Sequence, residues 1–259
     1  MTERWTGKHV WIVGASSGIG RALAVELAGQ EAVLALSARR PDALETLNTQ
    51  LGGGHRVVPL DVADGAAVRA AAQGLAAAWP RVDAVVFMAA VYRPGGLLAQ
   101  SDADVGAAVA VNLGGALHLA RAAIPLLRAQ DGGGQLVLTA SVAGYRGMPA
   151  SQPYSATKAA LIALAESLRI EHAGQGVDVR VINPGFVRTP LTDQNTFAMP
   201  GIIDAERAAR IIARDLARPG FEVAFPRGFV LGMKALRALP GFLYRPLARA
   251  ALRGASKTA

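Results

Sequence analysis

The chain has 259 residues, enough for one α/β domain of ordinary size. It contains no cysteine, which excludes disulfide bonds, thiolate metal sites and a cysteine nucleophile, and which fits a reducing, cytoplasmic location. Hydrophobic residues make up 52% and charged residues 18%, a balance that argues against a disordered chain. The net charge of +8 raises nucleic acid or an anionic membrane as a partner.

The excess charge lies at the C-terminal end. Residues 226–259 hold seven of the 27 basic residues and no acidic residue, so the first 225 residues hold 20 basic and 19 acidic residues. A nucleic-acid-binding function for the whole chain therefore loses its support. The C-terminal segment also lacks the interleaved aromatic residues of a base-stacking surface, so we expect no nucleic-acid partner.

Short apolar runs alternate with longer helical patterns along the first 225 residues. Strands are predicted at 10–13, 32–36, 56–60, 82–88, 135–139, 177–182 and 221–225. Helices are predicted at 19–28, 41–51, 64–79, 102–130, 153–172 and 204–216. This alternation predicts an α/β fold with a doubly wound parallel β-sheet of about seven strands and helices on both faces.

A glycine-rich turn, GASSGIG at residues 14–20, links the first predicted strand to the first predicted helix. Glycines permit positive φ angles and a close backbone approach, and the helix start offers free N–H groups to a pyrophosphate. The spacing is not the G-x-G-x-x-G of the common dinucleotide fingerprint, and a purely structural turn would look the same. Its place after the first strand of a doubly wound sheet favours phosphate binding.

Tyr154 and Lys158 lie four residues apart in a predicted helix and therefore on one helix face. A free tyrosine has a pKa near 10 and is a weak base at neutral pH, whereas a neighbouring ammonium group favours the phenolate and lowers that pKa. Most Tyr/Lys pairs at this spacing are surface pairs, so the spacing alone does not establish a catalytic site.

Taken together with further residues in the same order, these motifs make the chain resemble the short-chain dehydrogenase/reductase family. Gly14, Gly18 and Gly20 match the family's cofactor turn, and Asn112, Ser141, Tyr154 and Lys158 match its four catalytic positions. The resemblance extends from about residue 8 to residue 225. It implies a Rossmann-type short-chain dehydrogenase domain at residues 1–225, followed by a basic amphipathic C-terminal extension at residues 226–259.

The resemblance implies reversible conversion of a carbonyl to a secondary alcohol by hydride transfer. Tyr154 would donate the proton to the carbonyl and act as the base in reverse, and Ser141 would hydrogen-bond the substrate oxygen. Lys158 would lower the tyrosine pKa and hold the ribose hydroxyls, while Asn112 would hold a water that relays protons. The alternative is an NAD(P)-binding sensor or scaffold without significant turnover, against which the complete set of four residues argues.

The cofactor-binding residues that the resemblance implies are Gly14, Ser16, Ser17, Gly18, Ile19, Gly20, Arg39, Arg40, Asp61, Val62, Ala89, Tyr154, Lys158, Pro184, Gly185, Val187 and Thr189. Two segments depart from the family pattern. Val13 replaces the usual threonine before the turn, and the sequence FMAA at residues 87–90 replaces Asn-Asn-Ala-Gly. We expect these departures to affect cofactor affinity rather than the chemistry.

Two features bear on specificity. Ala38 stands where NAD-preferring relatives carry aspartate, and the adjacent Arg39 can pair with a phosphate, so we predict NADP(H) in preference to NAD(H). Alternatively, Arg39 and Arg40 are solvated residues at a helix start. The apolar segment 185–204 favours a lipophilic small-molecule substrate, although its side chains could instead pack on the domain. The four histidines show no metal-ligand spacing, and no metal is expected.

The C-terminal extension is predicted to form two amphipathic segments, 229–239 and 242–253, separated by Pro240 and Gly241. Arg245, Arg249 and Arg253 recur every four residues and form one basic stripe. Such a helix can lie on an anionic membrane, pack on a neighbouring subunit or cover the substrate entrance, and the sequence leaves these alternatives open. Family resemblance further implies a homodimer or homotetramer formed through the helices that carry Asn112 and Tyr154.

Overall fold

The computed structural model describes the backbone of residues 5–255 and the side chains of residues 5–250. Seven parallel strands form one sheet in the order β3-β2-β1-β4-β5-β6-β9. The strands are β1 (His9–Val13), β2 (Val33–Ser37), β3 (Arg56–Val57), β4 (Ala84–Phe87), β5 (Gly134–Thr139), β6 (Val177–Pro184) and β9 (Glu222–Phe225). This arrangement confirms the predicted doubly wound sheet.

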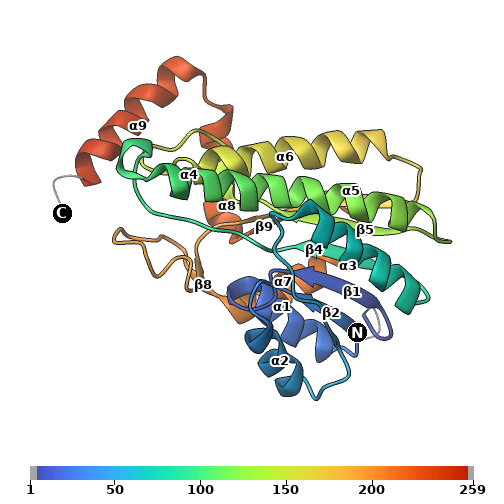
Figure 1. The fold of residues 1–259 in the computed structure, drawn as a ribbon. Helices are drawn as coiled ribbons and strands as arrows, with labels where there is room; N and C mark the ends of the chain where they lie inside the picture. The colour runs from blue at the N-terminus through green and yellow to red at the C-terminus, as the bar shows by residue number, and fades with distance from the viewer. Residues whose placement is uncertain (1–4, 256–259) are drawn as a thin grey trace.

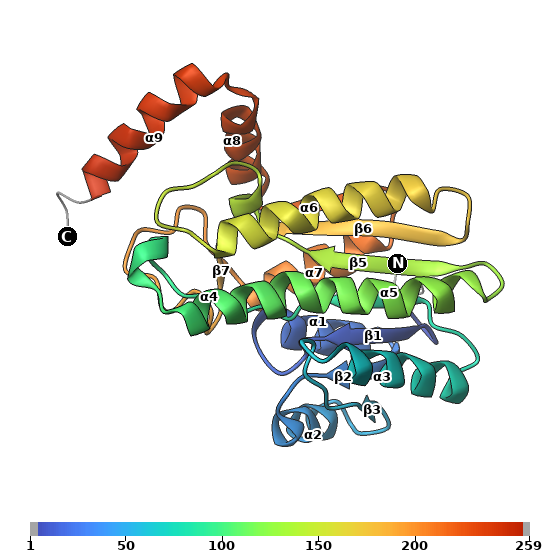
Figure 2. The same ribbon diagram turned by 45° about the horizontal axis from the view of Figure 1, so that its top comes forward.

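Helices cover both faces of this sheet (Figures 1 and 2). One face packs against α3 (Gly65–Ala78), α5 (Gly115–Arg128) and α6 (Tyr154–Glu171), and the other against α1 (Gly18–Ala28), α2 (Pro41–Gln50) and α7 (Ala205–Leu216). The period-two alternation of β1 explains how one strand serves both layers, since Trp11 and Val13 enter the first core while Val10 and Ile12 enter the second.

The long helix predicted at 102–130 is interrupted. It consists of α4 (Asp102–Ala108), a π-helical turn (Val109–Gly114) and α5. The third predicted strand is shorter than expected, although Val58 N–H still donates to Leu36 O at 2.9 Å and Leu60 N–H to Ala38 O at 3.0 Å. A small second sheet, β7 (Val187–Arg188) with β8 (Ile203–Asp204), was not predicted because its strands have only two residues each.

The stretch Asp102–Arg128 is long and apolar enough to cross a membrane by length and composition. In this fold 39% of its apolar window is buried. Leu119, Ala123 and Leu127 project from it into the core beneath the sheet. Packing of this central helix therefore accounts for part of its apolar character, whereas Val109 and Leu117 are exposed.

The C-terminal extension has two parts that differ in their packing, so residue 225 is not a boundary of the folded body. Helix α8 (Arg227–Ala238) buries Val230 and Met233 in the core, and Arg146 donates from Nη1 to Arg237 O at 2.9 Å. Helix α9 (Gly241–Ala255) instead extends away from the body (Figure 2). The side chain of Arg253 and all of Lys257 lie outside the described residues.

Candidate active site

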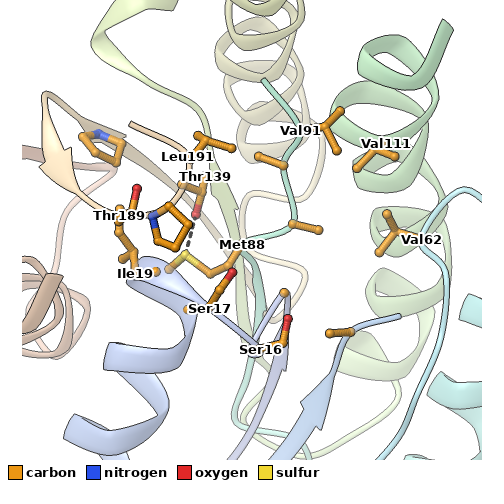
Figure 3. A pocket seen from close by; sticks show the side chains of 18 of the residues that line it. Ser16, Ser17, Ile19, Val62, Met88, Val91, Val111, Thr139, Thr189 and Leu191 are labelled. Atoms are coloured by element: carbon orange, nitrogen blue, oxygen red, sulfur yellow. Dashed lines mark hydrogen bonds between the residues drawn. The ribbon is translucent and has the colours of Figure 1, made fainter. Parts of the chain in front are cut away.

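A cavity of about 560 Å³ opens at the carboxyl ends of β1 and β4, where the strand order reverses. Ligands bind at such a switch point in doubly wound sheets. Every residue that the sequence predicted to bind the cofactor lines this cavity, as do Ser141 and the two residues Tyr154 and Lys158. In Figure 3, Ser16 and Ser17 lie on one side and Val91 and Val111 on the other, with Met88 between them.

The glycine turn leaves no room for side chains at its first and last glycines. Gly14 has φ +104°, and a Cβ there would lie 2.5 Å from the backbone nitrogen of Ala89. A Cβ on Gly20 would overlap the carbonyl oxygen of Gly14. The N–H groups at the start of α1 and Ser17 are thus exposed to the cavity on a closely packed backbone, which fits a pyrophosphate group.

Val13 and the FMAA segment at residues 87–90 depart from the family pattern, and other contacts hold the turn and the end of β4 in place. Backbone bonds fasten the turn, because Gly14 N–H and Ala15 N–H both donate to Ser37 O, at 2.7 and 3.0 Å. Met88 N–H donates to Val13 O at 2.6 Å. The Thr139 hydroxyl donates to the Met88 sulfur at 3.2 Å (Figure 3), so the thioether fills part of the cavity floor.

Ser141, Tyr154 and Lys158 meet at the ends of β5 and α6. Lys158 is almost fully buried, and its ammonium Nζ donates to Thr139 O at 2.8 Å and lies 5.5 Å from the centre of the Tyr154 ring. Ser141 Oγ donates to Pro184 O at 3.3 Å and accepts from Ala143 N–H at 3.1 Å. The three side chains therefore come from two segments, the end of β5 and the start of α6, and line one cavity.

Burial controls the titration of this pair more strongly than their mutual proximity does. Burial raises the pKa of Tyr154 to about 12, although a hydrogen bond with Ser141 opposes the rise. Burial lowers the pKa of Lys158 to about 7. The sequence predicted that Lys158 lowers the pKa of Tyr154, but in the structure that pKa is raised. The same burial also disfavours the ammonium charge of Lys158.

Asn112 is the one predicted catalytic residue that does not line the cavity. It is fully buried in the π-helical turn. Its Oδ1 accepts from Val91 N–H at 2.8 Å, and its Nδ2 donates to Val91 O at 2.9 Å and to Thr157 Oγ1 at 3.3 Å. Asn112 thus fastens the segment after β4, whose Val91 does line the cavity, to the start of α6.

A residue that sequence reasoning missed packs beside Tyr154. The Tyr92 ring packs edge-on against Tyr154 with 5.0 Å between centroids, and its hydroxyl donates to Asn195 Oδ1 at 2.8 Å. Tyr92 thereby connects Tyr154 to the loop between β7 and β8. No motif in the sequence marks this contact, because it joins three segments that are far apart along the chain.

The loop between β7 and β8 has mixed packing. Val187 and Ile203 are buried in the core, and the Phe186 ring packs on Phe197 and Phe229 at centroid distances of 6.0 and 5.4 Å. Val187 and Leu191 line the cavity. Some apolar residues of this segment therefore pack on the domain, and others line the cavity.

Arg39 and Arg40 line the far end of the cavity at the carboxyl end of β2, and both are exposed. Among the described residues neither has an ion-pair partner. The neighbouring Ser37 is buried, and its hydroxyl accepts from Trp11 Nε1 at 2.9 Å. The end of β2 thus places two exposed arginines in the lining of the cavity.

A polar cluster forms around Glu222 on β9, and it includes Asn183, the residue before the cavity-lining Pro184. The Glu222 carboxylate accepts from Asn183 Nδ2 at 2.6 Å and is also bonded by the Tyr145 hydroxyl and the Lys234 ammonium. Burial opposes ionisation of Glu222, but these hydrogen bonds outweigh it and lower its pKa. The cluster links α8 to the segment immediately before Pro184.

Residues 5–250 contain no group of three or more His, Asp or Glu side chains that could hold a metal ion. His118 Nδ1 lies 3.0 Å from Val62 O, and His9 packs on the Trp79 ring at 5.0 Å. His118 and His9 thus make packing and backbone contacts within the fold.

Comparison with known proteins identifies the family of this chain. The profile of the short chain dehydrogenase family matches residues 8–199. An uncharacterized oxidoreductase of Myxococcus xanthus is 33% identical over 92% of this chain and 95% of its own length. A 2-dehydro-3-deoxy-L-rhamnonate dehydrogenase (NAD(+)) of Sphingomonas is 34% identical over 74% of this chain and 76% of its own.

A solved short chain dehydrogenase/reductase from Burkholderia phymatum, in complex with NAD, superposes with a TM-score of 0.81. It is 27% identical, and the match covers 89% of this chain and 93% of that one. Its fold agrees with the doubly wound sheet described above. The chain therefore belongs to the short-chain dehydrogenase/reductase family and is an NAD(P)-dependent oxidoreductase.

Proposed function

We propose that this oxidoreductase interconverts a carbonyl and a secondary alcohol, with Tyr154 as general acid and base and NADP(H) as cofactor. The observation that carries the proposal is the meeting of Ser141, Tyr154 and Lys158 in the cavity that begins at the glycine turn. A substrate bound beside Tyr154 therefore shares one cavity with a cofactor held by that turn.

The proposed proton transfer follows from the state of Tyr154. With a pKa of about 12 the phenol is protonated at neutral pH, as a proton donor to a carbonyl oxygen must be. Ser141 stabilises charge developing on the same oxygen by hydrogen bonding. In the alcohol direction the phenol must first lose its proton, and a charged Lys158 beside it favours that loss. Asn112 acts in this proposal as a positioning residue, through Val91 and Thr157.

The cofactor-binding assignments are proposed on the same cavity. The N–H groups of the turn and Ser17 would hold the pyrophosphate, Asp61 and Val62 would border the adenine, and Pro184 and Gly185 would form the nicotinamide wall. When bound, the cofactor supplies or accepts the hydride.

The preference for NADP(H) is supported by the end of β2. A 2′-phosphate placed there would meet the guanidinium groups of Arg39 and Arg40, which can bind phosphate bidentately. The residue at the usual acidic position is Ala38, so no carboxylate there repels the phosphate. The relatives that name or contain NAD are 34% and 27% identical to this chain and leave the preference to be measured.

We expect at least a tenfold higher kcat/KM with NADPH than with NADH. The substitution Ala38→Asp should reverse this order, because it adds a carboxylate that binds a ribose hydroxyl and repels a phosphate. Initial rates with both cofactors, for the wild type and the variant, measure the effect. A tenfold preference of the wild type for NADH would overturn the assignment.

A lipophilic substrate is supported by the substrate side of the cavity. Val91, Leu191 and Val187 line it, and Tyr92 covers Tyr154. A panel of carbonyl compounds of increasing apolar size, followed through NADPH absorbance, tests the reaction class and the preference together. The proposal expects turnover that improves with apolar size, and no consumption of NADPH with any carbonyl would contradict it.

The remaining proposals concern assembly and location. Val109 and Leu117 are exposed on the helix that carries Asn112, which supports a homodimer or homotetramer formed through the long helices. Cytoplasmic location stays a prediction from the sequence. The alternative of a sensor or scaffold without turnover predicts NADPH binding with no chemistry and is distinguished by the Tyr154 variant described in the Discussion.

A further inference from the structure

Helix α9 touches the body along a narrow strip. Tyr244 donates from its hydroxyl to Gly147 O, and the Arg146 guanidinium lies 4.4 Å from the centre of the Tyr244 ring. Tyr244 and Ala248, four residues apart, are the half-buried positions on this side. The rest of the described helix faces outward, with Phe242, Leu243 and Leu247 exposed by 72%, 46% and 54%.

The exposed surface of α9 combines this apolar side with positive charge. Arg245 and Arg249 lie one turn apart and are exposed, and neither has an ion-pair partner among residues 5–250. No acidic residue occurs between positions 226 and 259. Apolar residues beside unpaired basic residues are the pattern of a helix that lies in the interface of an anionic bilayer.

Further exposed apolar residues lie at the same end of the molecule. Leu97 and Leu98, just before α4, are exposed by 50% and 101%, and Phe197, in the loop between β7 and β8, by 48%. Figures 1 and 2 show the start of α4, this loop and α9 at one end of the ribbon. The Phe197 loop also carries Asn195, which bonds Tyr92 beside Tyr154, so this end borders the substrate side of the cavity.

We propose that α9 and the apolar residues Leu97, Leu98 and Phe197 form a docking surface for an anionic membrane. Leu243 and Leu247 enter the acyl boundary, while Arg245 and Arg249 remain at the headgroups. A second copy of the chain fits this docking surface less well than a membrane does. A two-fold contact through α9 would bring the arginines of both copies together, and α9 has no acidic residue to pair with them.

Docking on a membrane would let the enzyme take its substrate from the bilayer. With this end on the bilayer, the substrate side of the cavity faces the membrane surface, and a lipophilic carbonyl or alcohol reaches Tyr154 without crossing water. This consequence rests on the proposed function, whereas lipid binding itself does not depend on turnover.

The test uses the full-length chain, because a cut before α8 would remove the buried side chains of Val230 and Met233. Partition into sedimented vesicles is measured for neutral phosphatidylcholine and for phosphatidylcholine with one third phosphatidylglycerol. Four proteins are compared: the wild type, Arg245→Gln/Arg249→Gln, Leu243→Asp/Leu247→Asp, and the matched control Arg207→Gln/Arg210→Gln, whose two exposed arginines lie on α7. Turnover of a water-soluble carbonyl and the oligomeric state are measured on the same samples.

We expect the wild type and the α7 control to bind anionic vesicles and to leave neutral ones largely unbound. The α9 variant should lose roughly thirtyfold in partition coefficient, about fivefold for each charge. Leu243→Asp/Leu247→Asp should abolish binding without changing the oligomeric state.

Equal partition of the α9 variant and the α7 control would overturn the proposal, as would a wild type that stays in the supernatant. Dissociation of an oligomer by the leucine variant, with vesicle binding unchanged, would assign the surface to a second copy instead. Lack of turnover in all samples would contradict the proposed function but not the docking surface.

Discussion

The glycine turn and helix α9 are built in opposite ways. In the turn, backbone contacts fix each position, and a single added carbon at Gly14 would lie 2.5 Å from a neighbouring backbone atom. Helix α9 is attached mainly through Tyr244 and leaves large apolar side chains exposed. A site that places its backbone against a ligand tolerates almost no added side-chain atoms. A surface that recognises charge and apolar area depends instead on exposed side chains, which can be substituted without disturbing the fold.

Among the expected effects on binding and stability, the largest is in the turn. Gly14→Ala should reduce NADPH affinity at least a hundredfold, because its Cβ overlaps the backbone of Met88 and Ala89 at a φ of +104°. Gly52→Ala is the matched control, since Gly52 has φ +91° but no atom within 4 Å of its Cβ position. The control should lose about 1 kcal/mol of stability and keep its NADPH affinity. Calorimetric titration with NADPH measures the affinity of both variants, and thermal unfolding measures their stability. An equal loss of NADPH affinity in the two variants would contradict the steric explanation.

A smaller effect is expected at Glu222, where α8 joins the body. Glu222→Gln should lower the free energy of unfolding by about 2 kcal/mol, because it weakens charge-assisted bonds from Lys234, Tyr145 and Asn183. The exposed Glu166→Gln on α6 should change it by no more than about 0.5 kcal/mol. Urea denaturation near neutral pH measures both variants.

The Glu222 carboxylate also predicts how folding stability changes with pH. Its folded-state pKa lies below the ordinary value of 4.5, so its stabilising contribution is present above that value and is lost as pH falls through the folded pKa. The stability gap between the wild type and Glu222→Gln should therefore close at acid pH. A gap that widens below pH 4.5 would contradict the assigned contacts.

The smallest effect is expected at the attachment of α9. Tyr244→Phe removes the hydroxyl bonded to Gly147 O and keeps the ring beside Arg146. Global stability should change by less than about 0.5 kcal/mol, while amide hydrogen exchange in α9 should rise a few-fold with no change in α6. Faster exchange throughout the chain would show that α9 is more closely coupled to the body than its contacts indicate.

The sheet and the cofactor side of the cavity could be predicted because their signals are local. Apolar runs with period two or 3.6 locate strands and helices, and strand ends in a parallel sheet meet at one edge, so residues as distant as Gly14, Asp61 and Pro184 line one cavity. The helix at 102–130 was predicted as uninterrupted, since nothing in the sequence marks the π-helical turn that buries Asn112.

The remaining features depend on tertiary contacts that no sequence pattern encodes. The packing of Tyr92 on Tyr154 joins segments far apart in the sequence, and the pKa of Tyr154 rises rather than falls because burial disfavours its phenolate. The sequence predicted two amphipathic segments in the basic C-terminal extension but did not distinguish how they pack. The two segments differ because α8 carries Val230 and Met233 at core-facing positions, whereas the described part of α9 buries no large apolar side chain.

The most direct test of the central claim is a comparison of Tyr154→Phe with the wild type. Initial rates of NADPH-dependent carbonyl reduction and the dissociation constant for NADPH are measured on the same preparations. Loss of the phenolic proton should lower kcat about a thousandfold and leave NADPH binding within about threefold. Turnover within tenfold of the wild-type rate would contradict the assignment of Tyr154 as the general acid and base.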